Sequence, residues 1–322
     1  MSNKALLKRF DTWRRENRML ALATVISTAG STYTKAGQRL LVADSGEYQG
    51  LVSGGCLEGD LATHAAEVIA SGKTRVVTYD LRDANDELFG LGIGCDGALR
   101  ILLQRLSPAH AYEPFATIAA SMRGDVTVNC TLVVGDLSEL PMGTTLISAE
   151  RSNARSSLAA AEVLYLPLRP IPRLLVLGAG QDAVPVVALA DLLGWRVTVV
   201  DHRPAYLALP AFVVADARVA APAADLASSV PLANFAAAIV MSHHLTTDRS
   251  YLSALAKSPV PYIGLLGPAG RRNRLLEEMG SGADTLAGRL HGPAGLDIGA
   301  DSPEAIALSI LAEIHALSRS RG

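Results

Sequence analysis

Near the middle of the chain the sequence reads Leu174-Leu175-Val176-Leu177-Gly178-Ala179-Gly180-Gln181-Asp182-Ala183. This stretch joins a short apolar run to a glycine-rich turn and then to the start of a helical segment. The spacing of Gly178, Gly180 and Ala183 matches G-x-G-x-x-A, the pattern of the first strand-to-helix turn of a Rossmann fold. The glycines allow a tight turn and the close approach of a phosphate, and the alanine allows close helix packing. We therefore predict a Rossmann-type domain built around this turn.

The same motif is weaker evidence for a bound dinucleotide such as NAD(P). Asp201 ends the next apolar run, 21 residues after Gly180, where it would accept a ribose hydroxyl. His202 and Arg203 follow it and would meet a phosphate or another anion. However, Asp182 places a negative charge inside the loop, near the expected position of a pyrophosphate. Because fold does not determine function, NAD(P) remains a possible ligand only.

Strands and helices alternate along the rest of this half. Continuous apolar strands between helices indicate a parallel sheet that is covered on both faces. The final helix has Ser302 as its predicted N-cap and Pro303 at its first position. The expected strands are residues 173–177, 196–200, 212–214, 237–241 and 262–266, and the first helix is 184–193.

A proline-rich segment precedes this half. Pro167, Pro170 and Pro172 fall within six residues and favour an extended linker. We therefore predict an α+β domain over residues 1–166, a linker over 167–172 and a doubly wound parallel Rossmann domain over 173–322. The first domain is expected to hold strands at 20–28, 39–42, 48–52, 74–81, 98–104 and 126–134, with helices at 62–70 and near 111–122.

Two glycine-rich loops in the first half carry cysteines. Ser53-Gly54-Gly55-Cys56-Leu57-Glu58-Gly59 stands between a strand and a helix, and Cys95 lies in a second loop at 90–97. A cysteine near a helix N-terminus has a lowered pKa, which makes it a nucleophile or a soft metal ligand. A zinc site from Cys56, Cys95 and His64 has little support, because neither cysteine has a C-x-x-C partner. Cys130, in an apolar run, is expected to be a buried small hydrophobe.

Further candidates follow predicted strands, at the edge where open α/β sheets bind ligands. His243 and His244 are adjacent, so one would face a ligand while the other packs, or both have structural roles. Asp248 would orient an imidazole or cap the next helix. Arg271, after a glycine turn, suits a phosphate or forms a solvated helix end. The loop at 30–39, with Lys35 and Arg39, either binds an anion or only connects strands, and the loop at 292–299 is expected to fold back onto the Rossmann edge.

Composition narrows the class of protein. The 322 residues have a formal net charge of −2, which argues against a nucleic-acid partner. No apolar run reaches the roughly 18 residues of a membrane span, and the N-terminus lacks a signal-peptide core. Three cysteines, an odd number, fit a reducing compartment. We expect a cytoplasmic protein with no membrane partner, and a homodimer as the default assembly.

Taken together, these motifs resemble the XdhC/CoxI family, the xanthine dehydrogenase accessory proteins. The resemblance implies a protein that binds the molybdenum cofactor, holds it while a cysteine desulfurase or sulfurtransferase exchanges an oxo ligand for sulfur, and delivers it to an apo molybdenum hydroxylase. Asp96 and Tyr33-Thr34 depart from the family pattern. These departures concern which cofactor form is bound and which client enzyme is served, more than the class of function. The resemblance rests on Gly30-Ser31-Thr32, Ser53 to Gly59, Gly94-Cys95, Gly178-Ala179-Gly180, Val199 to Arg203, Ser242-His243-His244, Tyr262 to Gly267, and Gly295 to Gly299.

The residue chemistry is compatible with this cargo. Molybdopterin, or its dinucleotide form, is an anionic phosphorylated pterin, and Cys56 would supply a soft contact to its metal or sulfur. The alternatives are an NAD(P)-dependent oxidoreductase with His243 or His244 as general acid/base, and a nucleotide-binding scaffold module. The predicted cofactor-binding residues are Gly54, Gly55, Cys56, Glu58, Cys95, Gly178, Gly180, Gln181, Asp201, Arg203, His243, His244 and Arg271.

Overall fold

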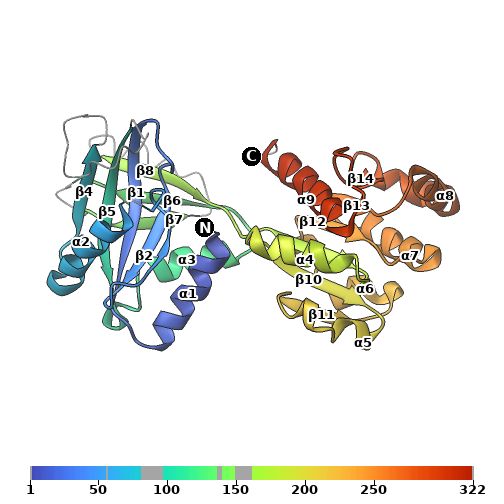
Figure 1. Cartoon of the computed structure of the whole chain (residues 1–322), viewed down its shortest axis with the longest axis horizontal. Helices are drawn as coiled ribbons and strands as arrows, with labels where there is room; N and C mark the ends of the chain where they lie inside the picture. Colours follow the sequence, from blue (N-terminus) through green and yellow to red (C-terminus); the bar gives the residue numbers. More distant parts are fainter. Residues whose placement is uncertain (1, 56, 81–96, 136–139, 149–161, 321–322) are drawn as a thin grey trace. The chain divides into compact units, whose positions relative to one another are not determined.

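The computed structural model describes residues 2–55, 57–80, 97–135, 140–148 and 162–320. The chain divides into two compact units, Met1–Pro170 and Ile171–Gly322, each with its own core (Figure 1). The first unit is α+β and the second is α/β, as the sequence predicts. Within the described residues, we find no helix with the length and apolarity needed to cross a membrane.

The first unit is built on a five-stranded antiparallel sheet with the order β3-β2-β1-β5-β4. Helix α2 (Glu58–Ser71) covers one face of this sheet and buries Leu61, Ala65 and Val68 against it. Helix α1 (Asn3–Arg15) packs on α3 (Phe115–Arg123), where the Phe10 and Phe115 rings meet edge to face at 4.8 Å. The strands are β1 (Leu20–Gly30), β2 (Arg39–Ala43), β3 (Tyr48–Gly50), β4 (Arg75–Asp80) and β5 (Gly97–Leu106).

A second sheet of three strands, in the order β7-β6-β8, completes this unit. Its strands are β6 (Val128–Val133), β7 (Thr145–Ser148) and β8 (Val163–Leu168). Strand β8 runs through Pro167 and Leu168, which the sequence assigned to the linker. This is possible because β8 is an edge strand, where a proline needs no partner for its missing N–H.

The second unit contains a six-stranded parallel sheet with the order β11-β10-β9-β12-β13-β14. Numbered along the unit, this is the 3-2-1-4-5-6 order of a Rossmann domain, which confirms the predicted fold class. The order reverses between β9 and β12, and this switch point is where such sheets bind ligands. The strands are β9 (Arg173–Leu177), β10 (Arg196–Asp201), β11 (Ala217–Ala220), β12 (Ala237–Val240), β13 (Ile263–Leu265) and β14 (Leu290–His291).

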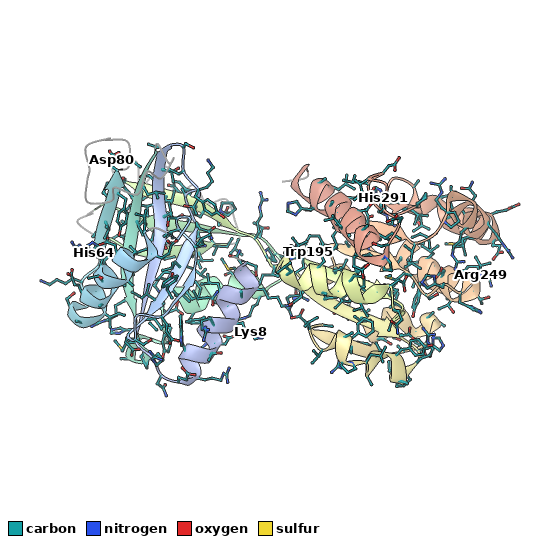
Figure 2. All side chains as sticks on the ribbon, viewed as in Figure 1. Lys8, His64, Asp80, Trp195, Arg249 and His291 are labelled. Carbon is teal, nitrogen blue, oxygen red and sulfur yellow. The ribbon has the colours of Figure 1, made fainter. Side chains whose placement is uncertain are left out.

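Helices cover both faces of the parallel sheet. Helices α4 (Ala183–Leu192) and α9 (Pro303–Ser320) lie side by side on one face, where Trp195 joins their core (Figures 1 and 2). Helices α7 (Leu245–Ala256) and α8 (Ala269–Met279) bury side chains in the core of the other face. Short helices α5 (Pro204–Leu207) and α6 (Leu226–Ser229) complete the unit.

Three details of this unit test the sequence predictions. The start of α9 is confirmed, since the Ala305 N–H donates to the Ser302 Oγ at 3.2 Å. The strand predicted at 212–214 is wrong: Pro210–Phe212 form a 3-10 turn, and the edge strand is β11. Strand β11 is largely exposed, so it lacks the apolar signature of a buried strand. Strand β14 has only two residues, too few for any periodicity to show.

Candidate functional site

In the first unit, the buried Glu58 carboxylate shapes the Ser53–Gly59 loop. Its Oε1 accepts the N–H groups of Val52 at 3.0 Å and Ser53 at 2.8 Å, and its Oε2 accepts the Ser53 hydroxyl at 2.5 Å. The Ser53 Oγ in turn accepts the N–H groups of Gly55 and Leu57 at 3.2 and 3.0 Å. Glu58 lies at the first turn of α2, and through these hydrogen bonds it holds the backbone of the loop in one conformation.

The glycines of this loop are exposed and have free space around them. Gly54, Gly55 and Gly59 are exposed, and a Cβ added to any of them would meet no described atom within 4 Å. Gly55 has a φ of +109°, a conformation that requires glycine. These glycines are thus not needed for internal packing, and they allow close approach from outside. Cys56 and Cys95, the two predicted cysteine contacts, lie outside the described residues.

Hydrogen bonding determines the charge state of Glu58. Burial raises the pKa of the Glu58 carboxyl, but the hydrogen bonds from Ser53 and the backbone N–H groups outweigh burial and hold that pKa below its usual value. Nearby, the Tyr79 hydroxyl donates to the Asp60 carboxylate at 2.7 Å. Burial and this bond raise the pKa of Tyr79. Among the described residues, no group of three or more His, Cys, Asp or Glu side chains is arranged to hold a metal.

The two cations of the loop at 30–39 lie in different environments. Lys35 is exposed, whereas Arg39 is only 7% exposed. Burial lowers the pKa of Arg39, and its Nε has no hydrogen-bond partner in the described part of the chain. Cys130 is 1% exposed, which confirms that it is a buried small residue. Burial raises the pKa of the Cys130 thiol, and the nearby Arg39 charge only partly offsets this effect.

In the second unit, the glycine motif packs tightly against the neighbouring loop at the switch point. Gly178 has a φ of +118°, and an added Cβ would lie 2.6 Å from the Met241 carbonyl oxygen. At Gly180, an added Cβ would lie 2.5 Å from the Asp182 Oδ1. The positions where side chains of these two residues would lie are therefore filled by atoms of the chain itself. At Gly180 the filling group is the Asp182 carboxylate.

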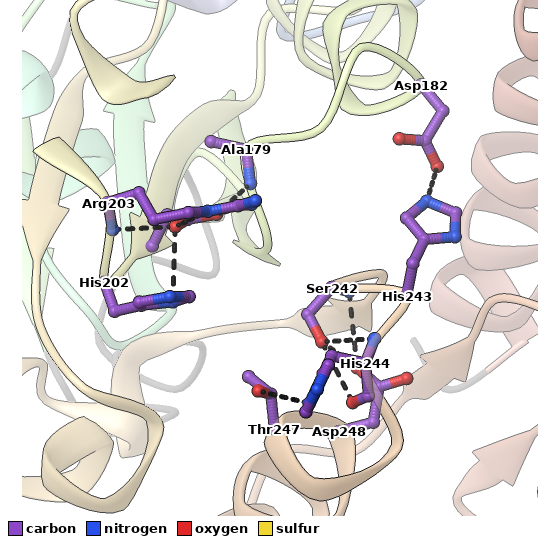
Figure 3. A network of polar contacts seen from close by, with 10 residues as sticks. Ala179, Asp182, His202, Arg203, Ser242, His243, His244, Thr247 and Asp248 are labelled. Carbon is purple, nitrogen blue, oxygen red and sulfur yellow. Dashed lines mark hydrogen bonds and ion pairs between the residues drawn. The ribbon is translucent and has the colours of Figure 1, made fainter. Parts of the chain in front are cut away.

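A hydrogen bond bridges the two loops of the switch point. The His243 Nε2 lies 2.7 Å from the Asp182 Oδ2, and Figure 3 shows these two side chains pointing toward one another. His243 has a φ of +62°, which is uncommon for a residue other than glycine and marks local strain. His244 turns away, and its Nδ1 lies 3.3 Å from the Thr247 hydroxyl. The two side chains diverge, and both are exposed; that one of them faces a ligand stays a prediction.

A buried carboxylate holds the backbone around His243 in place. Asp248, at the start of α7, accepts the Ser242 hydroxyl at 2.5 Å and the Ser242 N–H at 3.3 Å. Its other oxygen accepts the Arg271 Nη2 at 2.7 Å. Asp248 is 1% exposed, and its side-chain hydrogen-bond partners in the described part of the chain are Ser242 and Arg271, so it braces the turn rather than orienting a histidine. Arg271 belongs to the same brace, and its predicted role in phosphate binding stays a prediction.

Asp201 also differs from its predicted role. Its carboxylate is 2% exposed and accepts four hydrogen bonds: one from the Ala179 N–H at 2.8 Å and three from Arg203, each at 2.9 Å. A carboxylate has about four acceptor sites, so no site is left for a ribose hydroxyl. Burial raises the pKa of Asp201, but the bonds from Arg203 and Ala179 outweigh burial and hold that pKa below its usual range. Asp201 therefore positions Arg203, whose guanidinium stacks over the Tyr206 ring at 3.7 Å.

The loop at 292–299 folds back onto the edge of the sheet, as predicted, and borders an open cavity. The Ala294 N–H donates to the Leu265 carbonyl at 3.1 Å, at the end of β13. The cavity has a volume of about 740 Å³ and is bounded by the ends of β12 and β13, this loop and the first turns of α9. Asp182 and His243 line one side of it.

Comparisons with known proteins agree with this architecture. The model of the XdhC Rossmann domain matches residues 174–314, and that of the XdhC and CoxI family matches residues 13–80. A protein of Bacillus subtilis, named as a probable xanthine dehydrogenase subunit, is 30% identical over 91% of each chain. The chain belongs to the XdhC and CoxI family.

Two further relatives extend the comparison. The molybdenum cofactor insertion chaperone PaoD of Escherichia coli is 24% identical over 91% of this chain and 81% of its own. A crystal structure of a xanthine dehydrogenase from Bacillus halodurans superposes with a TM-score of 0.83, at 28% identity, over 100% of this chain and 97% of its own. The family match therefore covers both units.

The structure brings some of the predicted residues of this XdhC-type chain together and separates others. Gly178, Gly180 and His243 meet at the switch point, and Gln181 is exposed in the same loop. Gly54, Gly55 and Glu58 form one loop in the other unit. Sequence reasoning missed Ser53 as the partner of Glu58 and Asp182 as the partner of His243. The signal for the second pair was present, because both residues follow strands that are neighbours in a 3-2-1-4-5-6 sheet.

Proposed function

We propose that this protein holds the molybdenum cofactor as cargo and delivers it to an apo molybdenum hydroxylase of the xanthine dehydrogenase type. The observation that carries the proposal is the Ser53–Gly59 loop. Glu58 holds its backbone by hydrogen bonds, and its glycines have free space where a side chain would be. A pre-shaped backbone loop around a cysteine suits a bulky ligand that must bind and then leave. Kinship with PaoD, itself named a molybdenum cofactor insertion chaperone, supports the same class of function.

Within this proposal, Cys56 supplies a soft sulfur contact to the metal or to its sulfur ligand. In the sequence, Cys56 comes two residues before the first residue of α2, and a cysteine near a helix start is expected to favour the thiolate form that such a contact requires. Arg203 would contribute positive charge for the phosphate, because Asp201 and Tyr206 hold its guanidinium in one orientation. The cargo would be either molybdopterin or its dinucleotide form.

The proposal also names partners. A cysteine desulfurase or sulfurtransferase would supply the sulfur while the cofactor is held, and the client hydroxylase would then receive it. A homodimer is proposed as the working assembly, since closed twofold assemblies are the commonest among soluble oligomers.

The alternative proposals are an NAD(P)-dependent oxidoreductase and a nucleotide-binding scaffold. The 3-2-1-4-5-6 strand order favours both, because it is the order of dinucleotide-binding Rossmann domains. Two contacts weigh against a dinucleotide in this arrangement: Asp182 stands over Gly180, and Asp201 has no acceptor site left for a ribose. The accessory role therefore has the stronger support.

Cofactor retention tests the proposal. The purified chain, incubated with molybdenum cofactor and desalted, is expected to keep molybdenum in a fixed ratio to protein, measured by elemental and native mass spectrometry. Cys56→Ala should keep several-fold less, whereas Cys130→Ala, which removes a thiol from a strand core, should match the wild type. Equal retention by Cys56→Ala would remove the role of that cysteine. A wild type that keeps no molybdenum would overturn the function itself.

A further inference from the structure

A cavity lies beside Asp182 and His243 at the switch point, and the proposed function does not use it. Most of its wall is aliphatic or proline, including Met241, Leu266, Pro268, Pro293 and Ile306. A volume of about 740 Å³ lies within the range of small-molecule sites. Apolar walls with a few polar groups at one side are the usual composition of a site for a ring system.

The wall formed by the loop at 292–299 is held in place by a partly buried network. The Glu313 Oε2 accepts the Tyr262 hydroxyl at 2.6 Å and the Gly295 N–H at 2.7 Å, and its Oε1 lies 2.8 Å from the His291 Nδ1. The imidazole of His291 stacks on the Tyr262 ring (centroids 4.5 Å apart) and lies close to α9 in Figure 2. The cavity is therefore pre-formed rather than a gap beneath a loose loop.

The charges that line the cavity decide which ligands it can take. Among the described lining residues there is no Lys or Arg, while Asp182 and Asp297 contribute two carboxylates. A phosphate inside this cavity would face two carboxylates and no Lys or Arg side chain among these residues. A neutral ring that donates hydrogen bonds fits instead, because ionised carboxylates are acceptors only.

Asp182 has unused acceptor capacity for such donors. His243 occupies one position on its Oδ2, at 2.7 Å, and the Oδ1 accepts no hydrogen bond in the part of the chain that the structure describes. Each carboxylate oxygen has two acceptor sites, so both oxygens remain able to accept from a ligand. A pair of adjacent N–H donors in one plane matches a carboxylate with two parallel bonds.

We propose that this cavity binds a planar heterocycle through a 2-amino-4-oxo-pyrimidine edge, the edge shared by pterin and guanine. Asp182 accepts the ring N–H and the neighbouring amino group, and the proline and aliphatic walls cover the ring faces. His243 acts as a positioning residue that holds the Asp182 carboxylate toward the ring. The choice of pterin as the expected source rests on the proposed function, since the cargo is a pterin.

Direct titration of the full chain with phosphate-free and metal-free rings tests this site. Pterin, guanosine and adenosine would each be titrated into the wild type, with binding followed by calorimetry and by pterin fluorescence. Adenosine lacks the pair of adjacent donors and should not bind. If pterin binds and guanosine does not, the site belongs to the pterin; if guanosine also binds with the same dependence on Asp182, guanine compounds share it.

Two variants and two matched controls locate the binding. Asp182→Asn should weaken pterin binding about ten-fold or more, because the amide has one acceptor oxygen and a donor NH2 in place of two charged acceptor oxygens, so two parallel bonds can no longer form. Ala300→Phe, at the partly exposed rim, should weaken it by filling the cavity. Asp225→Asn and Ala208→Phe make the same chemical changes at exposed positions outside the cavity and should bind as the wild type does. Circular dichroism checks that each variant is folded.

The results separate this inference from the proposed function. Equal pterin affinity in the wild type and Asp182→Asn, binding of adenosine, or no binding of either pterin or guanosine would overturn the cavity assignment. Each of these outcomes leaves molybdenum retention through the Ser53–Gly59 loop to be decided by its own measurement. Conversely, pterin binding that depends on Asp182, in a chain that retains no molybdenum, would support the cavity and overturn the function.

Discussion

At the scale of single residues, Glu58 links stability to the shape of the cysteine loop. It is 0% exposed and accepts three hydrogen bonds from Val52 and Ser53. Glu58→Gln removes the charge and replaces one acceptor oxygen with a donor. We expect a loss of about 1.5–3 kcal/mol in the free energy of unfolding, measured by urea denaturation at neutral pH. Glu67→Gln, on the exposed side of the same helix, should cost less than about 1 kcal/mol.

The same residue predicts a pH dependence. Because the pKa of Glu58 in the folded state lies below its ordinary value of 4.5, its contribution is present above that value and is lost as the pH falls through the folded pKa. The stability difference between the wild type and Glu58→Gln should therefore be constant near neutrality and shrink in acid. A difference that grew as the pH fell below 4.5 would contradict the assignment of the charged form to the folded protein.

At the scale of elements, the turn between β12 and α7 is held by the pair of Asp248 and Arg271. The Asp248 side chain is 1% exposed and that of Arg271 is 20% exposed, so the pair is mostly removed from water. Asp248→Asn would leave the Arg271 charge without its partner and weaken the anchor of Ser242. We expect a loss of about 2 kcal/mol or more in the free energy of unfolding.

A double-mutant cycle separates this pair from general damage to the turn. Arg271→Met combined with Asp248→Asn should cost less than the sum of the two single changes, with a coupling of about 1 kcal/mol or more. Arg274→Met, at an exposed position of the same helix, should show no coupling to Asp248→Asn. If the double variant lost as much unfolding free energy as the two single variants together, the ion pair would not support the turn.

Element by element, the sequence predicts buried structure better than polar contacts. Strands β9, β10 and β12 are continuous apolar runs, and the start of α9 follows from the chemistry of Ser302 and Pro303. In contrast, β11 is an exposed edge and β14 is very short, so neither leaves a hydrophobic signature.

The candidate site shows the same division. The glycine motif and the histidines could be placed at the switch point, because their positions follow from strand order. The sequence could not show that Arg203 and the Ala179 N–H together saturate Asp201, or that Asp248 binds Arg271. Those contacts depend on side-chain directions in three dimensions, where several acceptors compete for each cation.

At the scale of the whole molecule, the two units have separate cores and one tryptophan each. Trp13 is buried in the first unit and Trp195 in the second, and the chain contains no other tryptophan. In a Trp195→Phe background, fluorescence therefore reports on the first unit, and in a Trp13→Phe background it reports on the second. Because each core is formed within one unit, we expect each to unfold as its own cooperative step.

The two destabilising changes test this division. Glu58→Gln should lower the urea midpoint that Trp13 reports and leave the midpoint that Trp195 reports unchanged, and Asp248→Asn should do the reverse. If either substitution shifted both midpoints equally, the units would unfold as one, and a change in the cysteine loop would be transmitted to the Rossmann unit through folding stability alone. Independent transitions would instead mean that cofactor retention and pterin binding can be altered separately, because a variant in one unit leaves the other folded.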